Sequence, residues 1–528
     1  MRKSKIDVAA LAAKPKKLPT SKDKSLIKKS DLPPALSAQE SERRGLGDFD
    51  FDTPKKGKLR VLPISDSPWA PTGFGTNTKN VSAILTKEGH HIGYGGCQNP
   101  QHQRYAVEWP LGSKESVDFE NLPIMFPGEE KFGEKSLPHW LKNFKPDVVW
   151  THLDFQMFQH LAGYKKPRNA NIPLYSEKTG KLLNRKERQE LITNIFKKVG
   201  SGTPWKWAAT IPFDGQPCIP FWQELLDSID YKICMSRYGQ LVMEEEFENC
   251  EESWYMPHGV DCNFFKPKLE PKFGGKPLKD IAGDAFVVGC VARNQHRKNI
   301  PRLVRGFKEF VDRNDLKPED VRLCLHMDWN DDMGWKFPDF AEQYGLEDYL
   351  MPPLMGILDA GEAPNELEMV DLYNCFDVFV LPTAGEGFGI PTIEAMACGI
   401  PVAVTNYTTA WEIIKEDDPE NATFPLYPLG KGANSGRDKL LEEDICPAGI
   451  LLPYKDLWWD TPKRAAPHRA IVSEIAIADA LDYYYHNPKK KLAAGIAARA
   501  KAKSEYDWPV LEKRWLALAK VWEERHKK

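Results

Sequence analysis

The chain has 528 residues, of which 41% are hydrophobic and 28% charged. This is an ordinary globular composition, in a chain longer than one hydrophobic core usually supports. No apolar run approaches the roughly 18 residues typical of a membrane span, and the basic N-terminus lacks the apolar core of a signal peptide. Ten scattered cysteines form no C-x-x-C pair, which argues against a zinc knuckle or a disulfide framework, and we expect a cytoplasmic protein with reduced thiols.

Charge is unevenly distributed along the chain, although the net charge is only −3. Residues 1–30 carry ten Lys and Arg against two Asp, and residues 165–206 carry eleven Lys and Arg against three Glu, a balance of +8 in each segment. This asymmetry indicates a polyanionic partner, and nucleic acid such as modified DNA is one candidate. The alternatives are a solvated tail with a solvated helix face, or contact with a membrane surface.

Strands alternate with helices in the N-terminal half. Residues 1–55 are rich in Lys, Pro, Ser and Ala and are predicted to form a disordered tail. A glycine loop follows the first strand, and beyond it Val81, Ile84 and Leu85 recur at helical spacing. The alternation predicts a parallel, doubly wound sheet, with strands expected at 58–65, 146–154, 205–215 and 230–236.

A second α/β half is predicted after a boundary near residue 266, and a helical pattern runs from about residue 470 to the end. The expected domains are residues 56–265, with a basic insertion at about 165–206, then residues 266–480, then C-terminal helices at 481–528 that pack back toward the N-terminal domain. Strands are expected in the second half at 285–292, 321–327, 377–382 and 401–405, and one of its helices is marked by Leu303, Val304, Phe307, Phe310 and Val311.

The first candidate ligand loop is "APTGFGTNT", which follows a predicted strand. Ligands of parallel α/β sheets bind beyond the carboxyl ends of the strands, and Gly73 and Gly75 allow a ligand to approach the backbone there. Thr78 stands where a dinucleotide fingerprint needs a third glycine, so the G-x-G-x-x-G motif is absent. The alternative is a tight turn without a ligand.

The second candidate loop is "RNQHRKN" (293–299), also directly after a strand. Arg293, His296, Arg297 and Lys298 place four basic or potentially basic groups within six residues. Cations are unfavourable at the start of a helix, where the dipole is already positive, unless an anion joins them. The loop therefore indicates a phosphate site, and the alternative is a charged helix start that faces water.

The third candidate loop lies in "GEGFGIPTIEAMACGIPVA" (385–403). Three alternating glycines precede a short helix expected at about 391–398, with Pro391 in its first turn and Gly399 just past its end. A glycine loop before a helix suits an anion, and Glu386 and Glu394 can accept hydrogen bonds from sugar hydroxyls. The pattern indicates a nucleotide-sugar, with a helix-capping role for Glu394 as the alternative.

These segments resemble the large family four of retaining glycosyltransferases, which has the GT-B fold of two Rossmann-like domains facing across a cleft. The third loop resembles the E-x7-E motif of that family, Glu386 through Glu394, and "CVARNQHRKN" resembles its diphosphate-binding segment. "YMPHGVDCNFF" is similar to its hinge, with His258 in place of the common Asn. The "SPWAPTGFGTNTKNVSAIL" and "DYKICMSRYGQ" segments are similar to two further motifs, so the resemblance covers roughly residues 58–525.

The resemblance implies transfer of a sugar from a nucleoside diphosphate sugar to an acceptor hydroxyl, with retention of configuration and with neither metal nor additional cofactor. It implies that Arg293 and Lys298 neutralise the leaving diphosphate, that Glu386 contacts the donor sugar and that Glu394 binds the ribose. The N-terminal domain would bind the acceptor. The donor-binding residues would further include Gly73, Gly75, Asn294, Phe388, Gly389 and Ile390.

One departure from the family concerns the strand end "ATIPFDG". Many relatives have a histidine there, whereas this chain has Asp214, which is a candidate for contact with the donor sugar or the acceptor hydroxyl. A turn or helix-capping role is the alternative for Asp214. The "WTHLD" segment places His152 and Asp154 at another strand end, and His152 is a second catalytic candidate, although no partner for it is evident.

Other parts of the sequence bear on functions other than sugar transfer. "HMDWNDD" has His326, Asp328, Asp331 and Asp332 after a strand, and we interpret it as an acidic surface loop in preference to a metal site. Motifs of P-loop NTPases, G-x-S-x-G hydrolases and H-E-x-x-H proteases do not occur. A GT-B-like sugar-nucleotide epimerase or phosphorylase remains an alternative enzyme. A nucleic-acid-binding protein that uses the basic segments is the non-enzymatic alternative.

Overall fold

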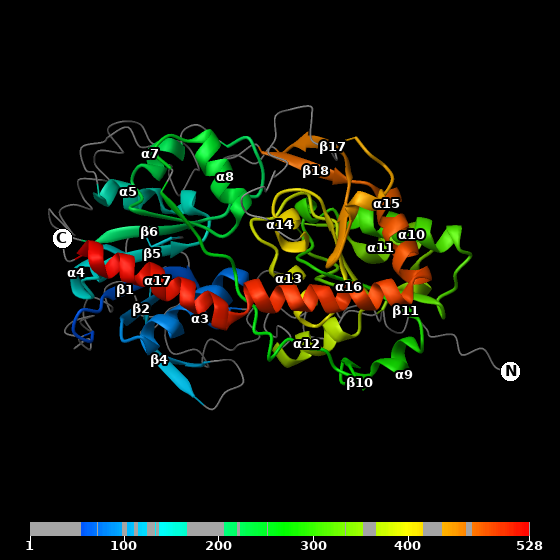
Figure 1. The fold of residues 1–528 in the computed structure, drawn as a ribbon, viewed down its shortest axis with the longest axis horizontal. Helices are drawn as coiled ribbons and strands as arrows, with labels where there is room; N and C mark the ends of the chain where they lie inside the picture. Colours follow the sequence, from blue (N-terminus) through cyan, green and yellow to red (C-terminus); the bar gives the residue numbers. More distant parts are fainter. Residues whose placement is uncertain are drawn as a thin grey trace, which may run out of the picture. The chain divides into compact units, whose positions relative to one another are not determined.

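Two mainly parallel sheets organise the computed structural model (Figure 1). It describes residues 54–70, 72–97, 103–109, 115–123, 132–133, 137–165, 205–218, 222–250, 252–332, 334–351, 366–415, 436–460 and 467–526. All of these residues belong to one compact unit, which begins at residue 53. The predicted tail up to residue 53, and residues 166–204 of the predicted basic insertion, lie outside the described residues.

The first sheet has eight strands in the order β3-β4-β2-β1-β5-β6-β7-β8. Its neighbours are parallel except for the antiparallel pair β3–β4 at the edge. All four strands predicted here are present, and the chain adds four more. The strands are β1 (Arg60–Asp66), β2 (His91–Cys97), β3 (Gln103–Glu108), β4 (Ser116–Pro123), β5 (Val148–His152), β6 (Lys206–Ile211), β7 (Tyr231–Cys234) and β8 (Ser253–Tyr255).

Helix α3 (Gly73–Lys87) covers this sheet and is the helix predicted after the first glycine loop. Val81, Ile84 and Leu85 are fully or almost fully buried, as their spacing predicts. Thr72 caps the helix by accepting a hydrogen bond from the amide of Gly75. The other helices here are α4 (Leu137–Asn143), η1 (Phe155–Phe158), α5 (Gln159–Lys165), α7 (Trp222–Leu226) and α8 (Arg237–Glu246). We call the part built on this sheet the N-terminal lobe.

The second sheet has six strands in the order β12-β11-β13-β14-β16-β15, parallel except for the edge pair β15–β16. Its predicted strands are β11 (Phe286–Val291), β12 (Val321–His326), β13 (Val378–Leu381) and β14 (Val402–Thr405), which the structure confirms. β15 (Ile445–Cys446) and β16 (Gly449–Leu452) complete it. We call the part built on this sheet the C-terminal lobe.

Helix α10 (Ile300–Arg313) buries the five apolar residues that predict it. The predicted short helix is α13 (Ile390–Ala397), with Pro391 in its first turn. Gly399, just past its end, has a φ of 78°. Short elements complete this lobe: β9 (Lys272–Phe273), β10 (Lys276–Pro277), α9 (Leu278–Ala282), η2 (His296–Lys298), α11 (Phe337–Tyr344), η3 (Glu347–Tyr349), α12 (Glu366–Asn374), α14 (Ala410–Ile414) and η4 (Glu442–Asp444).

The C-terminal segment starts with a hairpin and continues as helices. The hairpin is β17 (Tyr454–Trp459) and β18 (His468–Val472), and the helices are α15 (Glu474–His486), α16 (Pro488–Lys501), η5 (Ala502–Tyr506) and α17 (Trp508–His526). The predicted boundary between residues 480 and 481 falls inside α15, because one apolar face of this helix continues across it. Within the described residues, no helix is long and apolar enough to cross a membrane.

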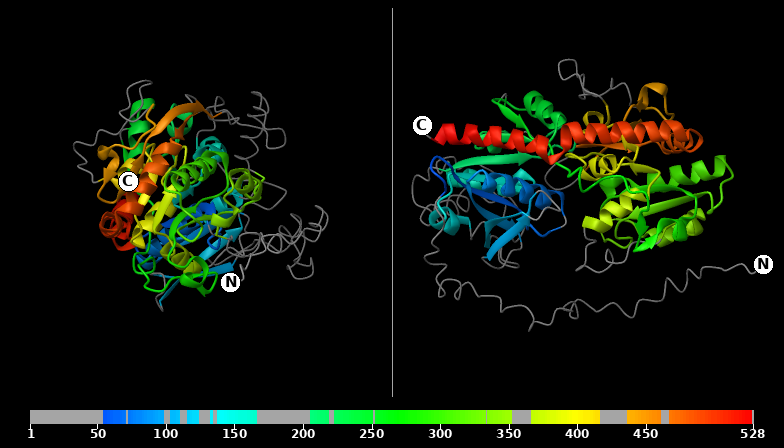
Figure 2. Two further views of the ribbon diagram at one scale, coloured as in Figure 1. Left: turned by 90° about the vertical axis from the view of Figure 1, so that its right-hand side faces the viewer. Right: turned by 60° about the horizontal axis from the view of Figure 1, so that its bottom comes forward.

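Helix α17 returns to the N-terminal lobe, where its side chains join the core around β1, β5 and β7. Trp508, Trp515 and Trp522 are at most 3% exposed in this core. The right-hand view of Figure 2 shows α17 beside the blue and cyan elements and α16 beside the yellow and green ones. The C-terminal segment therefore packs against both lobes.

Backbone and carboxylate contacts join the lobes next to the loops that follow the strands. Glu412 of α14 accepts hydrogen bonds from the amides of Arg237 (2.7 Å) and Tyr238 (3.1 Å) at the start of α8. Asp507 accepts a hydrogen bond from the amide of Cys262 at 3.1 Å, next to a backbone bridge with Val260. The strand-end loops of both sheets are thereby brought against each other.

Candidate active site

The second and third candidate loops lie side by side because β11 and β13 are parallel neighbours. β11 ends at Val291 and leads through residues 292–295 into η2, while β13 ends at Leu381 and leads through residues 382–389 into α13. The amide of Ala384 donates a hydrogen bond of 2.7 Å to the carbonyl of Arg297. Residues 88 positions apart in sequence, such as Lys298 and Glu386, therefore meet.

Glu386 lies at the centre of this contact and is 8% exposed. One carboxylate oxygen, Oε1, is 2.5 Å from Nζ of Lys298, and the other, Oε2, is 3.1 Å from Nη1 of Arg297. The amide of Glu386 donates to Oγ1 of Thr408 at 3.0 Å. The carboxylate is thus held by two cations on adjacent positions of η2.

The charges in this cluster stabilise one another. Burial alone would raise the pKa of Glu386, but Lys298 and Arg297 lower it to about 2. Burial lowers the pKa of Lys298 against the opposing effect of Glu386. The pKa of Arg297 is raised, because Glu386 and Asp214 outweigh the effect of burial. Glu386 is therefore an ionised carboxylate near neutral pH.

Asp214 reaches the same cluster from the N-terminal lobe. Its Oδ2 is 3.7 Å from Nε of Arg297. Gly385 lies against its backbone, since a Cβ atom at Gly385 would approach the carbonyl oxygen of Asp214 to 2.2 Å. Gly385 is therefore required by close contact between the lobes. The predicted residues that the structure brings together are Lys298, Glu386 and Asp214, joined by Arg297.

Arg293 does not join this cluster. Its side chain is 64% exposed and its Nε lies 3.1 Å from Oδ2 of Asp331. Arg297, four positions later, faces the glycine loop instead and pairs with Glu386. The role of Arg293 at the diphosphate stays a prediction, and Arg297 is an additional candidate for it.

Asn294 is fully buried and braces the loop after β12, while its predicted donor-binding role stays a prediction. Its Nδ2 donates to the carbonyls of Asp328 (2.9 Å) and Trp335 (2.7 Å), and its Oδ1 accepts from the amide of Trp335 at 3.0 Å. These three bonds use both ends of the amide. We infer that Asn294 is structural.

Replacement of Asn294 by alanine should lower the free energy of unfolding by about 2–4 kcal/mol, because a buried side chain and its three hydrogen bonds to the backbone are lost. Urea unfolding of the variant measures this loss. Asn330→Ala is the matched control, since Asn330 is exposed in the same region. Equal stability of the two variants would contradict the bracing role of Asn294.

Glu394 lies on α13 and is half-buried. Its Oε2 accepts a hydrogen bond of 2.6 Å from the hydroxyl of Tyr373 on α12. This contact is separate from the Glu386 cluster, although both glutamates belong to one loop–helix unit. The structure thus places Glu394 next to a hydroxyl group of the protein, which is the kind of donor that a sugar also offers.

The first glycine loop lies against the start of α13. A Cβ atom at Gly73 would approach Cδ1 of Ile390 to 2.7 Å, so the two predicted donor-binding residues pack against each other across the lobes. A Cβ atom at Gly75 would meet the carbonyl oxygens of Ser67 and Ala70 at 2.9 and 3.1 Å. Both glycines are therefore explained by packing within the protein.

Phe388 and Gly389 shape the end of the third loop. Phe388 is 3% exposed, and its ring centroid lies 5.4 Å from that of His258 and 5.6 Å from that of Tyr506. Gly389 has a φ of 110° and immediately precedes α13, a conformation that favours glycine. The ring of Phe388 is a packing element, and the backbone of the loop is the part that can face a ligand.

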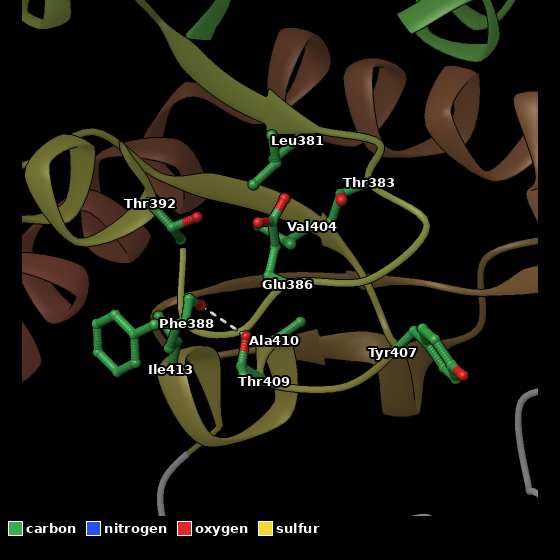
Figure 3. A pocket seen from close by; sticks show the side chains of 10 residues that line it. All are labelled: Leu381, Thr383, Glu386, Phe388, Thr392, Val404, Tyr407, Thr409, Ala410 and Ile413. Atoms are coloured by element: carbon green, nitrogen blue, oxygen red, sulfur yellow. Dashed lines mark hydrogen bonds between the residues drawn. The ribbon is translucent and has the colours of Figure 1, made fainter. Parts of the chain in front are cut away.

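The side chains beneath the loop form a tightly packed interior. Figure 3 shows Glu386 among Leu381, Thr383 and Val404, with the hydroxyl of Thr409 donating to the carbonyl of Phe388 at 2.6 Å. The space enclosed there is too small for a water molecule.

His152 is fully buried in the N-terminal lobe. Its Nδ1 lies 2.7 Å from Oγ1 of Thr78, and its ring stacks on those of Trp150 (5.3 Å) and His258 (5.2 Å). Burial lowers the pKa of both His152 and His258, the latter to about 3. His152 is thus a neutral, buried residue whose ring packs within the protein, and its catalytic role stays a prediction.

Three residues near the cluster were not assigned a role from the sequence: Arg297, Asp154 and Arg469. Burial and the neighbouring Asp214 raise the pKa of Asp154 to about 6. Arg469 pairs with Asp214 at 3.1 Å. Arg297 could have been chosen from the sequence, because it lies within the basic loop. Arg469 could not, because it belongs to a hairpin that the sequence pattern did not predict.

The acidic segment after β12 forms an ion pair and hydrogen bonds with neighbouring loop residues. Asp331 pairs with Arg293, and Oδ1 of Asp328 accepts a hydrogen bond of 2.8 Å from the amide of Asn330. Burial lowers the pKa of His326 to about 4. Across the described stretches of the chain, no group of three or more His, Cys, Asp and Glu is arranged to hold a metal ion.

Comparison with known proteins finds similar sequences for the C-terminal lobe. Residues 285–428 match the family model described as "Glycosyl transferases group 1". The chain is also similar to the O-antigen chain mannosyltransferase B of Escherichia coli, 30% identical over 138 residues, and to the lipopolysaccharide core biosynthesis mannosyltransferase LpsB of Rhizobium meliloti, 30% identical over 161 residues. These matches cover 25% and 30% of this chain, and 31% and 41% of the relatives' own lengths.

Solved structures resemble almost the whole chain. A glycosyltransferase from Rickettsia africae matches with a TM-score of 0.53 at 15% identity, covering 88% of this chain and 98% of its own. HepE of Anabaena, solved in complex with UDP and glucose, matches with a TM-score of 0.53 at 13% identity, covering 88% and 100%. At these identities the likeness establishes the fold, and it confirms the predicted GT-B architecture.

Proposed function

We propose that this chain is a retaining glycosyltransferase, which moves a sugar from a nucleoside diphosphate sugar to an acceptor hydroxyl. The observation that carries the proposal is the buried contact of Glu386 with Lys298 and Arg297 where two strand-end loops meet. The match to group 1 glycosyltransferases supports it, because residues 285–428 contain all three side chains.

The cluster suits departure of a diphosphate. In the transfer, the bond between the anomeric carbon and the diphosphate oxygen breaks, the acceptor oxygen bonds to that carbon on the same face, and the acceptor proton leaves with the diphosphate. Arg297 and Lys298 stabilise the negative charge that develops, and Glu386 is placed to accept hydrogen bonds from sugar hydroxyls. These cations make a metal ion unnecessary in the proposal, so we expect EDTA to leave transfer unchanged.

Different observations limit the candidate donors and the candidate acceptors. HepE binds UDP and glucose, and two of the relatives are mannosyltransferases, so UDP-sugars and GDP-mannose are the first donors to test. For the acceptor we propose a polyanion, on the basis of the two segments with a balance of +8. Salt-dependent binding of DNA would support this acceptor.

A donor panel tests the reaction. Purified protein is incubated with UDP-glucose, UDP-N-acetylglucosamine, GDP-mannose or ADP-glucose and candidate acceptors, and released nucleoside diphosphate and glycosylated products are identified by mass spectrometry. Proton NMR of the product gives the anomeric configuration. Isomerisation of the donor without transfer would instead indicate an epimerase, and a strict need for inorganic phosphate a phosphorylase. No consumption of any donor would contradict the proposal.

Replacement of Glu394 by alanine should weaken binding of the nucleoside diphosphate roughly 10–100-fold, because a charged hydrogen-bond acceptor for ribose hydroxyls is lost. Isothermal titration with UDP and GDP measures the change. Tyr373→Phe is the matched control, since it removes one internal hydrogen-bond donor to Glu394 but keeps the carboxylate. Equal losses in both variants would assign Glu394 to the support of α12 and not to the ribose.

A further inference from the structure

The hairpin β17–β18 forms a separate two-stranded sheet in the C-terminal lobe. Its strands pair antiparallel, with Trp458 opposite Arg469 and Trp459 opposite His468. It lies between β16 and α15 in the chain, outside residues 285–428 that match the family model. The hairpin is therefore an element whose role the family match does not explain.

The second strand of this hairpin, β18, forms hydrogen bonds with both lobes next to the candidate site. The amide of His468 donates to the carbonyl of Gln216 in the N-terminal lobe at 2.7 Å. The amide of Ala470 donates to the carbonyl of Ala384 in the glycine loop at 3.0 Å, and the carbonyl of Ala470 accepts from Nδ2 of Asn299 at 2.9 Å. Residues 468–470 thus contact the three segments that carry the cluster: the loop after β6, the segment after β11 and the loop after β13.

Arg469 lies in the middle of these contacts, and its side chain is 7% exposed. Its Nε donates to Oδ2 of Asp460 at 2.9 Å, which anchors the guanidinium within the hairpin segment. Its Nη1 donates to the carbonyl of Asp214 at 2.5 Å and lies 3.1 Å from Oδ1 of the same residue. A planar guanidinium held at several points fixes both the backbone and the side chain of its partner.

The Asp214 carboxylate is consequently shared between two arginines. Oδ1 lies 3.1 Å from Arg469, whereas Oδ2 lies 3.7 Å from Arg297. Without Arg469, Asp214 would be free to form a direct hydrogen bond with Arg297. Arg297, which now forms a hydrogen bond with Glu386 alone of the two carboxylates, would then form hydrogen bonds with both and would be less available to an incoming diphosphate.

We propose that Arg469 is a positioning residue for sugar transfer: it holds Asp214 in place and so keeps the charge of Arg297 available for the donor diphosphate. This inference rests on the proposed function. It assigns to the β17–β18 hairpin the task of completing the donor site from outside the matched family region.

The experiment measures kcat and donor KM for Arg469→Gln, Arg469→Lys, Asp214→Asn and the double variant Asp214→Asn with Arg469→Gln, using the donor that the panel identifies. Arg469→Gln should lower kcat/KM on the order of 10–100-fold, as expected when a reacting group is misplaced, and Arg469→Lys should lose less. In the Asp214→Asn background, Arg469→Gln should add little, because the competing carboxylate is already gone. Arg305→Gln, which removes an arginine paired with Glu474 on α15, controls for general loss of an ion pair.

The outcomes separate the two proposals. Full activity of Arg469→Gln, or effects of Asp214→Asn and Arg469→Gln that simply multiply, would overturn the positioning role while leaving transfer intact. Equal loss in Arg305→Gln would also overturn it. An unmodified protein that consumes no sugar nucleotide would instead contradict the proposed function, and the inference would fall with it.

Discussion

Replacement of both Arg297 and Lys298 by alanine is expected to lower kcat/KM for sugar transfer by about 10³-fold or more, since removal of a single charge-stabilising donor already costs 10²–10³-fold in other enzymes. The two cations lie 3.1 and 2.5 Å from the Glu386 carboxylate, in a site sheltered from water. Negative charge that develops on a leaving diphosphate would be stabilised strongly there, because the low local dielectric increases each interaction.

The matched control for this prediction is Arg293→Ala. Arg293 is 64% exposed and pairs with Asp331, and exposed pairs contribute roughly 0–1 kcal/mol. Its removal should therefore change kcat/KM by no more than about fivefold. Steady-state kinetics on Arg293→Ala, Arg297→Ala and Lys298→Ala would compare the three basic residues directly. A loss in Arg293→Ala as large as that in Arg297→Ala would show that the arginine chosen from the sequence is the functional one.

Four strands of the second sheet could be predicted from their apolar residues, whereas β2 of the first sheet could not. β11 (FVVGCV), β13 (VFVL) and β14 (VAVT) are buried at every position, so their sequences are nearly continuous apolar runs without an alternating pattern. β2, in contrast, has the sequence HIGYGGC, where three glycines interrupt the apolar run. Gly93 is required there because a Cβ atom would meet Leu122 and Phe144 at 2.8 Å. This packing requirement depends on residues distant in sequence.

The loops of the candidate site could be predicted from the sequence, but not which of their side chains face one another. Charge density in residues 293–298 identified the loop, but only the turn of η2 determines that Arg297 faces Glu386 and Arg293 faces Asp331. Asp214 could be singled out from its strand end, whereas its partner Arg469 is 255 positions away. No local pattern reports a contact of that length, because it arises from the return of a hairpin to the opposite lobe.

Replacement of Glu386 by glutamine is expected to lower the free energy of unfolding at pH 7 by about 3–5 kcal/mol, which is the usual cost of breaking a buried ion pair on one side. Glutamine keeps the size of the side chain but leaves the buried charges of Lys298 and Arg297 without their carboxylate. Urea unfolding measures the loss, and Glu443→Gln is the control, because Glu443 is 66% exposed and lies 3.7 Å from Arg437. A loss no greater than that of the control would contradict the burial of this charge cluster.

The same substitution should change how stability depends on acid. The pKa of Glu386 is about 2 in the folded protein and 4.5 as its ordinary value. A carboxyl whose pKa is lower in the folded than in the unfolded state adds stability above the unfolded value, and this stability is lost as pH falls through the folded value. The gap in unfolding free energy between the unmodified protein and Glu386→Gln should therefore narrow by up to about 3 kcal/mol between pH 4.5 and pH 2.

Urea unfolding at pH 6, 4 and 3 follows this narrowing. A gap that stays constant over that range would mean that Lys298 and Arg297 do not hold Glu386 in its ionised form, and the diphosphate site built on these three residues would lose its electrostatic basis.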